Sequence, residues 1–189
     1  MISLFEPQQI SEVILVKPQR FGDDRGFFSE TFRENAFRDA GICGPFVQDN
    51  HSLSVEPGVI RGLHFQTQPS PQSKLVRCTR GRILDVAVDV RRGSPTFGRH
   101  VCAELSAENG HQLYIPVGFA HGLCTLEPNC EVQYKVTGYY DPAADKGVLW
   151  SDPDIGINWP LEGREPILSE KDRAQPILAD LPDYFPFER

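Results

Sequence analysis

Short stretches in which hydrophobic and polar residues alternate are the main pattern along this chain. Residues 83–90, ILDVAVDV, place valine at every second position from Val86 onward, which is the period of a half-buried β-strand. Gly81 separates this stretch from residues 74–79, KLVRCT, which we predict to be its hairpin partner. The same kind of pattern predicts further strands at 101–105, 112–115 and 131–140.

Helical patterns are few. Residues 31–41, TFRENAFRDAG, predict one short helix, with Thr31 and Glu34 as a capping box and Gly41 at its end. Dense strands with so little helix are typical of a mainly β fold, an antiparallel sandwich or barrel.

The last part of the chain differs from the rest. From about Pro153 it is rich in proline, and we predict that it packs over the barrel with one helical turn near Ser169. No repeat and no linker interrupts the sequence, so we expect residues 1–189 to form a single domain.

Composition and charge narrow the classes of function. Sixteen glycines and sixteen prolines among 189 residues imply many tight turns. The net charge of −7 argues against nucleic acid as a partner. Because no run of about 18 apolar residues occurs, we predict no membrane-spanning helix.

Cysteine usage indicates the compartment. The five cysteines are odd in number and contain no C-x-x-C pair, which favours reduced thiols and a cytoplasmic protein over a disulfide framework. We expect them to be small core residues rather than metal ligands; they are Cys43, Cys78, Cys102, Cys124 and Cys130.

Two histidines lie in distinctive surroundings. His64 ends the stretch IRGLH, and Gly62 before it leaves room for a close approach to the backbone. A histidine in a strand is either a satisfied structural residue or a reactive base, and both interpretations stay open. The stretch PVGFAH, which ends at His121, is similar to the second motif of the cupin barrels, whose histidine points into the barrel.

The first cupin motif is incomplete. In metal-binding cupins it has two histidines flanking one residue and a glutamate nearby, whereas here His64 is followed by Gln66 and no glutamate. One imidazole from each motif is fewer than the three protein ligands that a catalytic metal site requires. We therefore predict a metal-free site.

Three further residues could carry chemistry, each with a structural alternative. Tyr134 shares a strand face with Val132 and Val136, so its phenol is either a proton donor in an apolar cavity or a packed ring with a hydrogen-bonded hydroxyl. Lys74 is either at a strand end, reaching for water, or a buried cation facing an oxyanion. Asp172 either completes a loose capping box with Ser169 or orients a histidine.

Taken together, seven stretches resemble the dTDP-4-dehydrorhamnose 3,5-epimerase family, cupin enzymes of dTDP-L-rhamnose synthesis. They run in the family's order along nearly the whole chain: FGDDRGFFSETF (21–32), FVQDNHS (46–52), VIRGLHFQ (59–66), KLVRCTRGRILDVAVDVRRGSPTFG (74–98), LSAENGHQLYIPVGFAHG (105–122), YKVTGYYDP (134–142) and ILSEKD (167–172). The resemblance implies a jelly-roll antiparallel barrel with a few short helices.

The family's chemistry implies an activity and roles. The substrate is dTDP-4-dehydro-6-deoxy-D-glucose, whose ketone acidifies the protons on carbons 3 and 5, so that each epimerisation passes through an enolate. His64 is expected to be the base, oriented by Asp172; Lys74 stabilises the enolate oxygen and Tyr134 returns a proton from the other face. No cofactor is expected.

The family also implies how the nucleotide is held. Cations must converge on the diphosphate, and Arg25, Arg61 and Lys171 are the candidates. Glu30, Gln48, Asp49 and Asn50 are expected to contact the nucleotide, His121 the sugar and Tyr140 the thymine. Because Arg25 and Glu30 belong to an arm that reaches the partner's site in this family, a homodimer with exchanged arms is expected.

Two departures and one alternative qualify the resemblance. The family's usual acidic residue after the tyrosine pair is glutamate, and here the shorter Asp145 stands in that loop. Arg61 and His64 differ in strand parity, so a bulge near Gly62 or a contact across the dimer is needed for both to serve one site. The alternative activity is that of a monofunctional 3- or 5-epimerase of another deoxysugar pathway.

Overall fold

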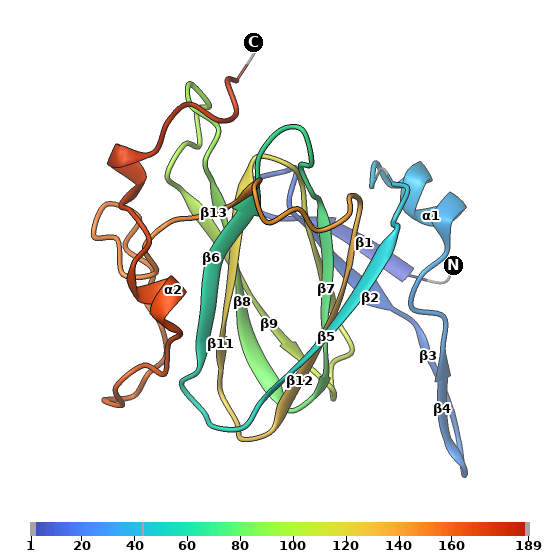
Figure 1. Ribbon diagram of the computed structural model, residues 1–189. Helices are drawn as coiled ribbons and strands as arrows, with labels where there is room; N and C mark the ends of the chain where they lie inside the picture. The colour runs from blue at the N-terminus through green and yellow to red at the C-terminus, as the bar shows by residue number, and fades with distance from the viewer. Residues whose placement is uncertain (1–2, 43, 188–189) are drawn as a thin grey trace.

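Two antiparallel sheets face each other in this computed structural model, which describes residues 3–42 and 44–187 (Figure 1). The six-stranded sheet has the order β1 (Ser3–Pro7), β2 (Ile14–Pro18), β10 (Gln112–Ile115), β7 (Lys74–Arg80), β12 (Cys130–Val136) and β5 (Gln48–Ser54). The five-stranded sheet has the order β13 (Asp145–Gly147), β6 (Ile60–Gln66), β11 (Phe119–Thr125), β8 (Arg82–Asp89) and β9 (His100–Ser106). The predicted mainly β fold is confirmed.

A third, small sheet stands apart from these two. It is the hairpin of β3 (Arg20–Asp23) and β4 (Gly26–Ser29), which projects away from the rest of the molecule (Figure 1). Phe27 and Phe28 on it are 63% and 70% exposed. The Arg20 guanidinium lies over the Phe27 ring, 4.3 Å from its centroid.

The main core fills the space between the two large sheets. Residues from β7 to β12 point inward, such as Val76 and Cys78 on β7, Ile83 and Ala87 on β8 and Val132 on β12. The predicted face shared by Val132 and Tyr134 is confirmed, since the Tyr134 ring packs against this core.

Strand β8 is buried on both faces, and not on one as its alternation predicted. Val86 and Val88 pack on the outer side under the C-terminal segment, against residues such as Trp159 and Leu178. On the inner side Asp85 is fully buried. The polar positions of the pattern therefore face an interior site and not solvent.

The predicted hairpin between 74–79 and 83–90 is wrong. β7 pairs with β10 and β12, whereas β8 pairs with β9 and β11. Gly81 has a φ of 74°, and its left-handed turn carries the chain from one sheet to the other. Any side chain there would lie 2.7 Å from the Cys130 sulfur.

The helices are short. Helix α1 (Glu34–Asp39) begins three residues later than predicted, and its N-cap is Arg33 without a side-chain hydrogen bond, so the Thr31 capping box is wrong. The buried Phe37 holds α1 against the outer face of the six-stranded sheet. The strand predicted at 131–140 ends at Val136, and a loop follows.

The C-terminal segment covers the outer face of the five-stranded sheet, as predicted (Figure 1). Its helical turn is α2 (Glu170–Arg173), capped by Ser169, and the 3₁₀ turn η1 (Leu178–Asp180) follows. Asp152 pins this segment, because its carboxylate accepts a hydrogen bond from the Leu178 amide at 2.6 Å.

Four of the cysteines are free thiols, and Cys43 lies outside the described residues. Cys78, Cys124 and Cys130 are buried as predicted, whereas Cys102 is exposed because it points outward from β9. Among the described residues, no helix is long and apolar enough to span a membrane.

Candidate active site

A β-bulge in β6 sets the geometry of the site. His64 pairs with His121 of β11, but Arg61 pairs with Leu123, so two residues of β6 face one of β11. A Cβ on Gly62 would lie 2.5 Å from the Gly122 Cα, which is why the two strands need glycine here. The bulge restores a shared face to Arg61 and His64, as their predicted common function required.

His64 faces an aspartate from the C-terminal segment. Its Nε2 lies 2.6 Å from Oδ1 of Asp172, and the His64 side chain remains 29% exposed while that of Asp172 is 5% exposed. The dyad that the sequence offered as one of two alternatives is therefore present.

Asp172 also has the capping role that was the other alternative. The Ser169 hydroxyl donates to its Oδ2 at 2.6 Å and accepts from its backbone N–H at 3.1 Å. Burial alone would raise the pKa of Asp172, but the hydrogen bonds and electrostatic interaction with His64 and the hydrogen bond from Ser169 hold it below its ordinary value. Asp172 thus stays ionised beside His64.

The opposite sheet supplies a cation and a phenol. Lys74, at the start of β7, is buried, and its Nζ donates to the His64 carbonyl oxygen at 3.2 Å. Burial lowers its pKa to about 8, although the carboxylates of Asp85 and Asp145 partly oppose this. Of the two alternatives for Lys74, the structure has the buried cation.

Tyr134 lies on the neighbouring strand β12, two registered positions from Lys74. Burial raises its pKa above the ordinary value for a phenol, against the lowering effect of the Arg61 charge. The hydroxyl is therefore protonated at neutral pH, which suits a proton donor.

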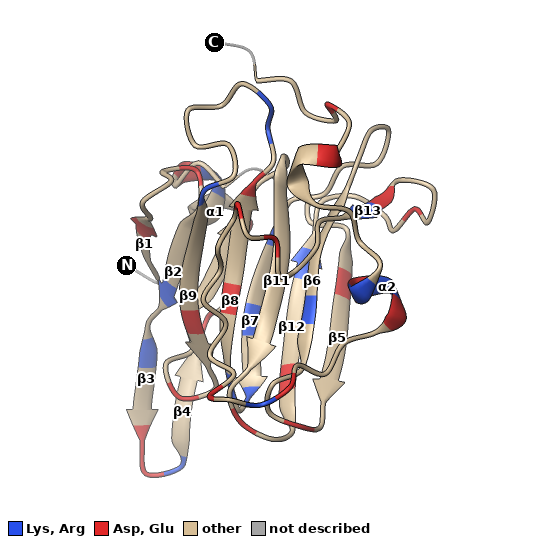
Figure 2. Ribbon diagram, turned by 90° about the vertical axis from the view of Figure 1, so that its left-hand side faces the viewer, with Lys and Arg blue, Asp and Glu red and all other residues tan. Residues whose placement is uncertain are grey.

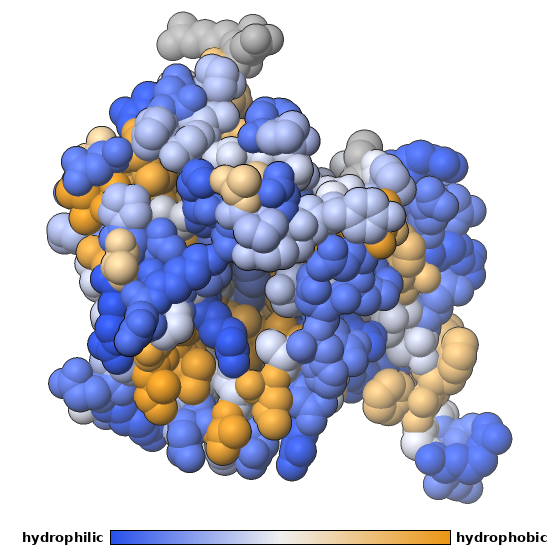
Figure 3. Space-filling model, in the orientation of Figure 1, coloured by the Kyte–Doolittle hydropathy of each residue, from blue (hydrophilic) through white to orange (hydrophobic). Residues whose placement is uncertain are grey.

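These groups line a cavity of about 240 Å³ between the sheets. In the space-filling view a hollow opens between the side of α2 and that of β5, with hydrophilic surface around most of it and hydrophobic atoms below (Figure 3). Eleven residues line the cavity: Gln48, Asn50, His64, Phe65, Gln66, Gln72, Lys74, Tyr134, Tyr140, Asp145 and Lys171.

Asp145 joins two of the predicted nucleotide contacts at the cavity's mouth. Its Oδ2 accepts a hydrogen bond from the Tyr140 hydroxyl at 3.0 Å and forms an ion pair with Lys171. Figure 2 shows the charged residues of α2 close to β13, where Asp145 lies. The shorter side chain of Asp145 thus still reaches both neighbours.

A second histidine–aspartate pair lies deeper. His121 Nε2 is 2.7 Å from Oδ1 of Asp85, and both side chains are buried. Burial lowers the pKa of His121, although Asp85 opposes this. Asp85 is not among the predicted site residues. The signal that could have found it is its place on the same strand face as Ile83 and Ala87, which line the core.

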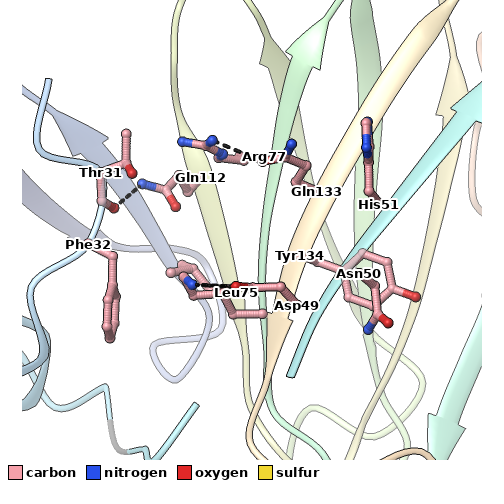
Figure 4. Close-up of a pocket in the computed structure, with 11 residues that line it drawn as sticks. Thr31, Phe32, Asp49, Asn50, His51, Leu75, Arg77, Gln112, Gln133 and Tyr134 are labelled. Carbon is pink, nitrogen blue, oxygen red and sulfur yellow. Dashed lines mark hydrogen bonds and ion pairs between the residues drawn. The ribbon is translucent and has the colours of Figure 1, made fainter. Parts of the chain in front are cut away.

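Several predicted site residues lie outside the cavity of their own chain. Asp49 points to the outer side of the six-stranded sheet, where Lys135 donates to it at 2.9 Å (Figure 4). It lines a separate hollow of about 390 Å³ that also includes Phe32 and Arg77. A contact between Asp49 and nucleotide remains a prediction.

Arg25 and Glu30 are also remote. Arg25 is at the tip of the projecting hairpin and pairs with Asp23 at 2.5 Å, and Glu30 pairs with Arg33 at 2.7 Å. Arg61 borders the site, where its guanidinium acts on Tyr134, but its hydrogen bonds go to Ser54 and Leu53.

The arrangement suits proton transfer across a flat substrate. His64 of the five-stranded sheet, with Asp172 of α2 behind it, lies on one side, and Lys74 and Tyr134 of the six-stranded sheet lie on the other. In the part of the chain that the structure describes, no group of three or more His, Cys, Asp or Glu side chains is placed to hold a metal ion.

Comparison with known proteins identifies relatives of this arrangement. Residues 7–180 match the family model described as dTDP-4-dehydrorhamnose 3,5-epimerase. The dTDP-4-dehydrorhamnose 3,5-epimerase of Sinorhizobium fredii is 55% identical over 183 residues, which are 97% of this chain and 93% of that protein.

Solved structures agree. The epimerase of Legionella pneumophila, crystallised with dTDP-4-keto-L-rhamnose, has a TM-score of 0.94 and 42% identity, with 99% of each chain covered. The Bacillus anthracis dTDP-4-dehydrorhamnose 3,5-epimerase, crystallised with TDP and PPi, has a TM-score of 0.89 and 47% identity, covering 93% of this chain and 99% of that one. The fold class predicted from the sequence is thereby confirmed.

Proposed function

Because the chain belongs to the dTDP-4-dehydrorhamnose 3,5-epimerase family, we propose that its cavity converts dTDP-4-dehydro-6-deoxy-D-glucose into dTDP-4-dehydro-L-rhamnose. The enzyme is an isomerase of dTDP-L-rhamnose synthesis. We place the reaction in the cytoplasm, in keeping with the cysteine pattern.

The proton transfers follow from the two walls of the cavity. His64 takes the proton from carbon 3 or 5, and the electron pair moves into the C4 carbonyl to give an enolate. Asp172 stabilises the imidazolium that forms. Tyr134 then donates its proton to the carbon from the other face and recovers one from solvent, while His64 releases its proton to solvent.

Lys74 stabilises the enolate. Its ammonium lies next to the His64 backbone, close to where the oxygen would gain charge. One well-placed donor of this kind contributes about 3 kcal/mol to lowering the barrier. The ketone is itself the electron sink, so the reaction needs no cofactor, and dialysis against EDTA is expected to leave the rate unchanged.

The observation that carries the proposal is the placement of base and acid on opposite sheets. His64 and Asp172 lie on the β6 side, and Lys74 and Tyr134 come from β7 and β12. An inversion at carbon requires removal and return of a proton on opposite faces, and a single-walled site could not do this without turning the substrate over.

Isotope exchange tests the proposal. In deuterated water, turnover should place deuterium at carbons 3 and 5 of the product, as followed by NMR. Label at one carbon only would leave a monofunctional epimerase. Tyr134→Phe should still exchange protons at the substrate carbons but form little of the inverted product.

Nucleotide recognition is part of the same proposal. Lys171 and Arg61 bind the diphosphate, Gln48 and Asn50 contact the nucleotide, and Tyr140 stacks on thymine. Because Asp145 neutralises Lys171 in the free site, the diphosphate shares that cation with Asp145 when it binds.

We further propose a homodimer in which the β3–β4 hairpin enters the partner's cavity and brings Arg25 and Glu30 to it. Its support is the projection of this hairpin and the 89% exposure of the Arg25 side chain. The exposed rings of Phe27 and Phe28 would be covered by such an exchange.

Mixed dimers test the exchange. Arg25→Ala and His64→Asn subunits, unfolded together and refolded, should recover about a quarter of wild-type activity, because half of the dimers are mixed and each has one complete site. If the arm served its own subunit, no mixed site would be complete and no activity would return.

A further inference from the structure

Gln66, the last residue of β6, binds the loop that carries Tyr140. Its Nε2 donates to the Ser70 carbonyl at 2.7 Å and to the Tyr139 carbonyl at 3.2 Å. Its Oε1 accepts from the Asp141 backbone N–H at 2.8 Å. The side chain is only 4% exposed, and nearly all its hydrogen-bonding capacity is spent on backbone groups.

Two other glutamines hold the same loop. Nε2 of Gln72 donates to the Gly138 carbonyl at 2.6 Å, and Oε1 of Gln48 accepts from the Tyr140 N–H at 3.2 Å. Each residue from 138 to 141 therefore has a backbone group bound by a glutamine side chain. We call Gln48, Gln66 and Gln72 the glutamine clamp.

The loop has little else to fix its shape. Residues 138–140 make no hydrogen bond to another backbone group within residues 3–42 and 44–187. Tyr139 and Tyr140 are 71% and 57% exposed, so neither ring anchors the loop in a core. The Tyr140 hydroxyl bonds to Asp145, but this contact fixes the tip of the ring and not the backbone of the loop. Without the amides, the backbone there would sample many conformations.

We propose that Gln66, with the rest of the glutamine clamp, is a positioning residue that holds Tyr140 ready for the base of the nucleotide substrate. This inference rests on the function proposed above, since it concerns how that site binds its substrate. A flexible Tyr140 would have to be ordered when the nucleotide binds, and that cost would weaken the affinity.

The position of Gln66 links the clamp to the catalytic strand. It lies two residues after His64 on the same strand and lines the same cavity. The strand that carries His64 therefore also holds the loop of Tyr140, the ring proposed to contact the nucleotide.

Gln66→Met tests the proposal, because methionine has a similar length and no amide. We expect KM for the 4-keto sugar nucleotide and Kd for dTDP to rise about tenfold, with kcat within about twofold of wild type. Amide hydrogen exchange at Tyr140 and Asp141 should become faster. Combined with Tyr140→Ala, the change should add little to the KM of Tyr140→Ala alone, since both remove the same contact.

Controls separate this proposal from its rivals. Gln133→Met removes a glutamine whose Oε1 accepts from Arg77 on the outer face of the sheet, and it should leave KM unchanged. A folded Gln66→Met enzyme with wild-type KM would overturn the clamp. Fully additive effects with Tyr140→Ala would do the same, because Gln66 would then act elsewhere.

Gln72→Ala serves if Gln66→Met does not fold. Gln72 is half-buried and loses one hydrogen bond, so KM should rise about threefold while the melting temperature stays close to wild type. An unchanged KM in this variant would overturn the clamp as well. Wild-type protein that fails to exchange deuterium would instead refute the proposed function.

Discussion

The two histidine–aspartate pairs of this protein differ in how far they are closed off from solvent. His64 and His121 lie opposite each other on β6 and β11, and each has a carboxylate oxygen within 2.7 Å of its Nε2. The His64 side chain is 29% exposed and lines the cavity, whereas that of His121 is 9% exposed.

The second oxygens of the two carboxylates differ as well. Oδ2 of Asp172 accepts a hydrogen bond from the Ser169 hydroxyl at 2.6 Å, while its Oδ1 faces His64 Nε2. Among the described residues, the Oδ2 atom of the buried Asp85 has no hydrogen-bond partner. The difference teaches that access to the cavity, and not the identity of the two side chains, separates the pair proposed to exchange protons with the substrate from the buried pair.

The largest effect should come from removing each imidazole in turn. His64→Asn is expected to lower deuterium exchange at both carbons by at least about a thousandfold, the scale of a lost general base. His121→Asn should lower it by about tenfold, because burial keeps His121 neutral and removes it from proton transfer. Exchange rates measured by NMR on both variants decide this.

Equal losses in the two variants would contradict the comparison. So would a larger loss for His121→Asn, which would make the buried pair the base. Circular dichroism of both proteins should confirm that neither has lost its sheets.

The next effect concerns the carboxylate behind the base. Asp172→Asn is expected to lower kcat by about a hundredfold, since an amide cannot stabilise the imidazolium. Ser169→Ala, which removes the cap but leaves the carboxylate, should cost about 1 kcal/mol of folding stability and little activity. A Ser169→Ala enzyme as slow as Asp172→Asn would show that Asp172 acts only through the position of α2.

The sequence predicted those parts of the site that depend on local alternation. Parity placed Lys74 on one face with Val76 and Cys78, and both of these line the interior. The sequence also showed that a bulge near Gly62 is needed if Arg61 and His64 are to serve one site, because in a regular strand they face opposite ways.

Contacts between distant segments could not be predicted in this way. Asp85 and His121 are 36 residues apart on two strands, and their pairing depends on register. The sheet that each strand joins depended on the turn at Gly81, and the burial of β8 on both faces depended on a segment more than 60 residues later. The glutamine clamp was missed for the same reason.

The third effect tests the cation. The pKa of Lys74 is about 8, below its ordinary value because of burial, so its ammonium is present below that pH and is lost as the pH rises through it. The plot of kcat/KM should therefore fall about tenfold per pH unit above pH 8. Lys74→Arg should be slower at neutral pH but show no such fall, since guanidinium keeps its charge.

Tyr134 cannot cause the same fall, because burial raises the pKa of its phenol above the ordinary value of 10. If kcat/KM of Lys74→Arg still fell above pH 8, the fall would belong to another group, and Lys74 would not have the proposed role.

The smallest effect distinguishes Asp85 from Asp172 by what each does to the pH dependence of kcat/KM. The charges of Asp85 and Asp145 raise the pKa of Lys74, and that of Lys171 lowers it. Asp85→Asn should therefore move the falling limb to lower pH and cost a few-fold in kcat/KM at pH 8, with a smaller change at pH 6.5. Asp172→Asn should lower the whole profile and leave the limb in place. If Asp85→Asn lowered the profile evenly, its charge would have no effect on Lys74, and the buried pair would differ from the exposed one only in access to solvent.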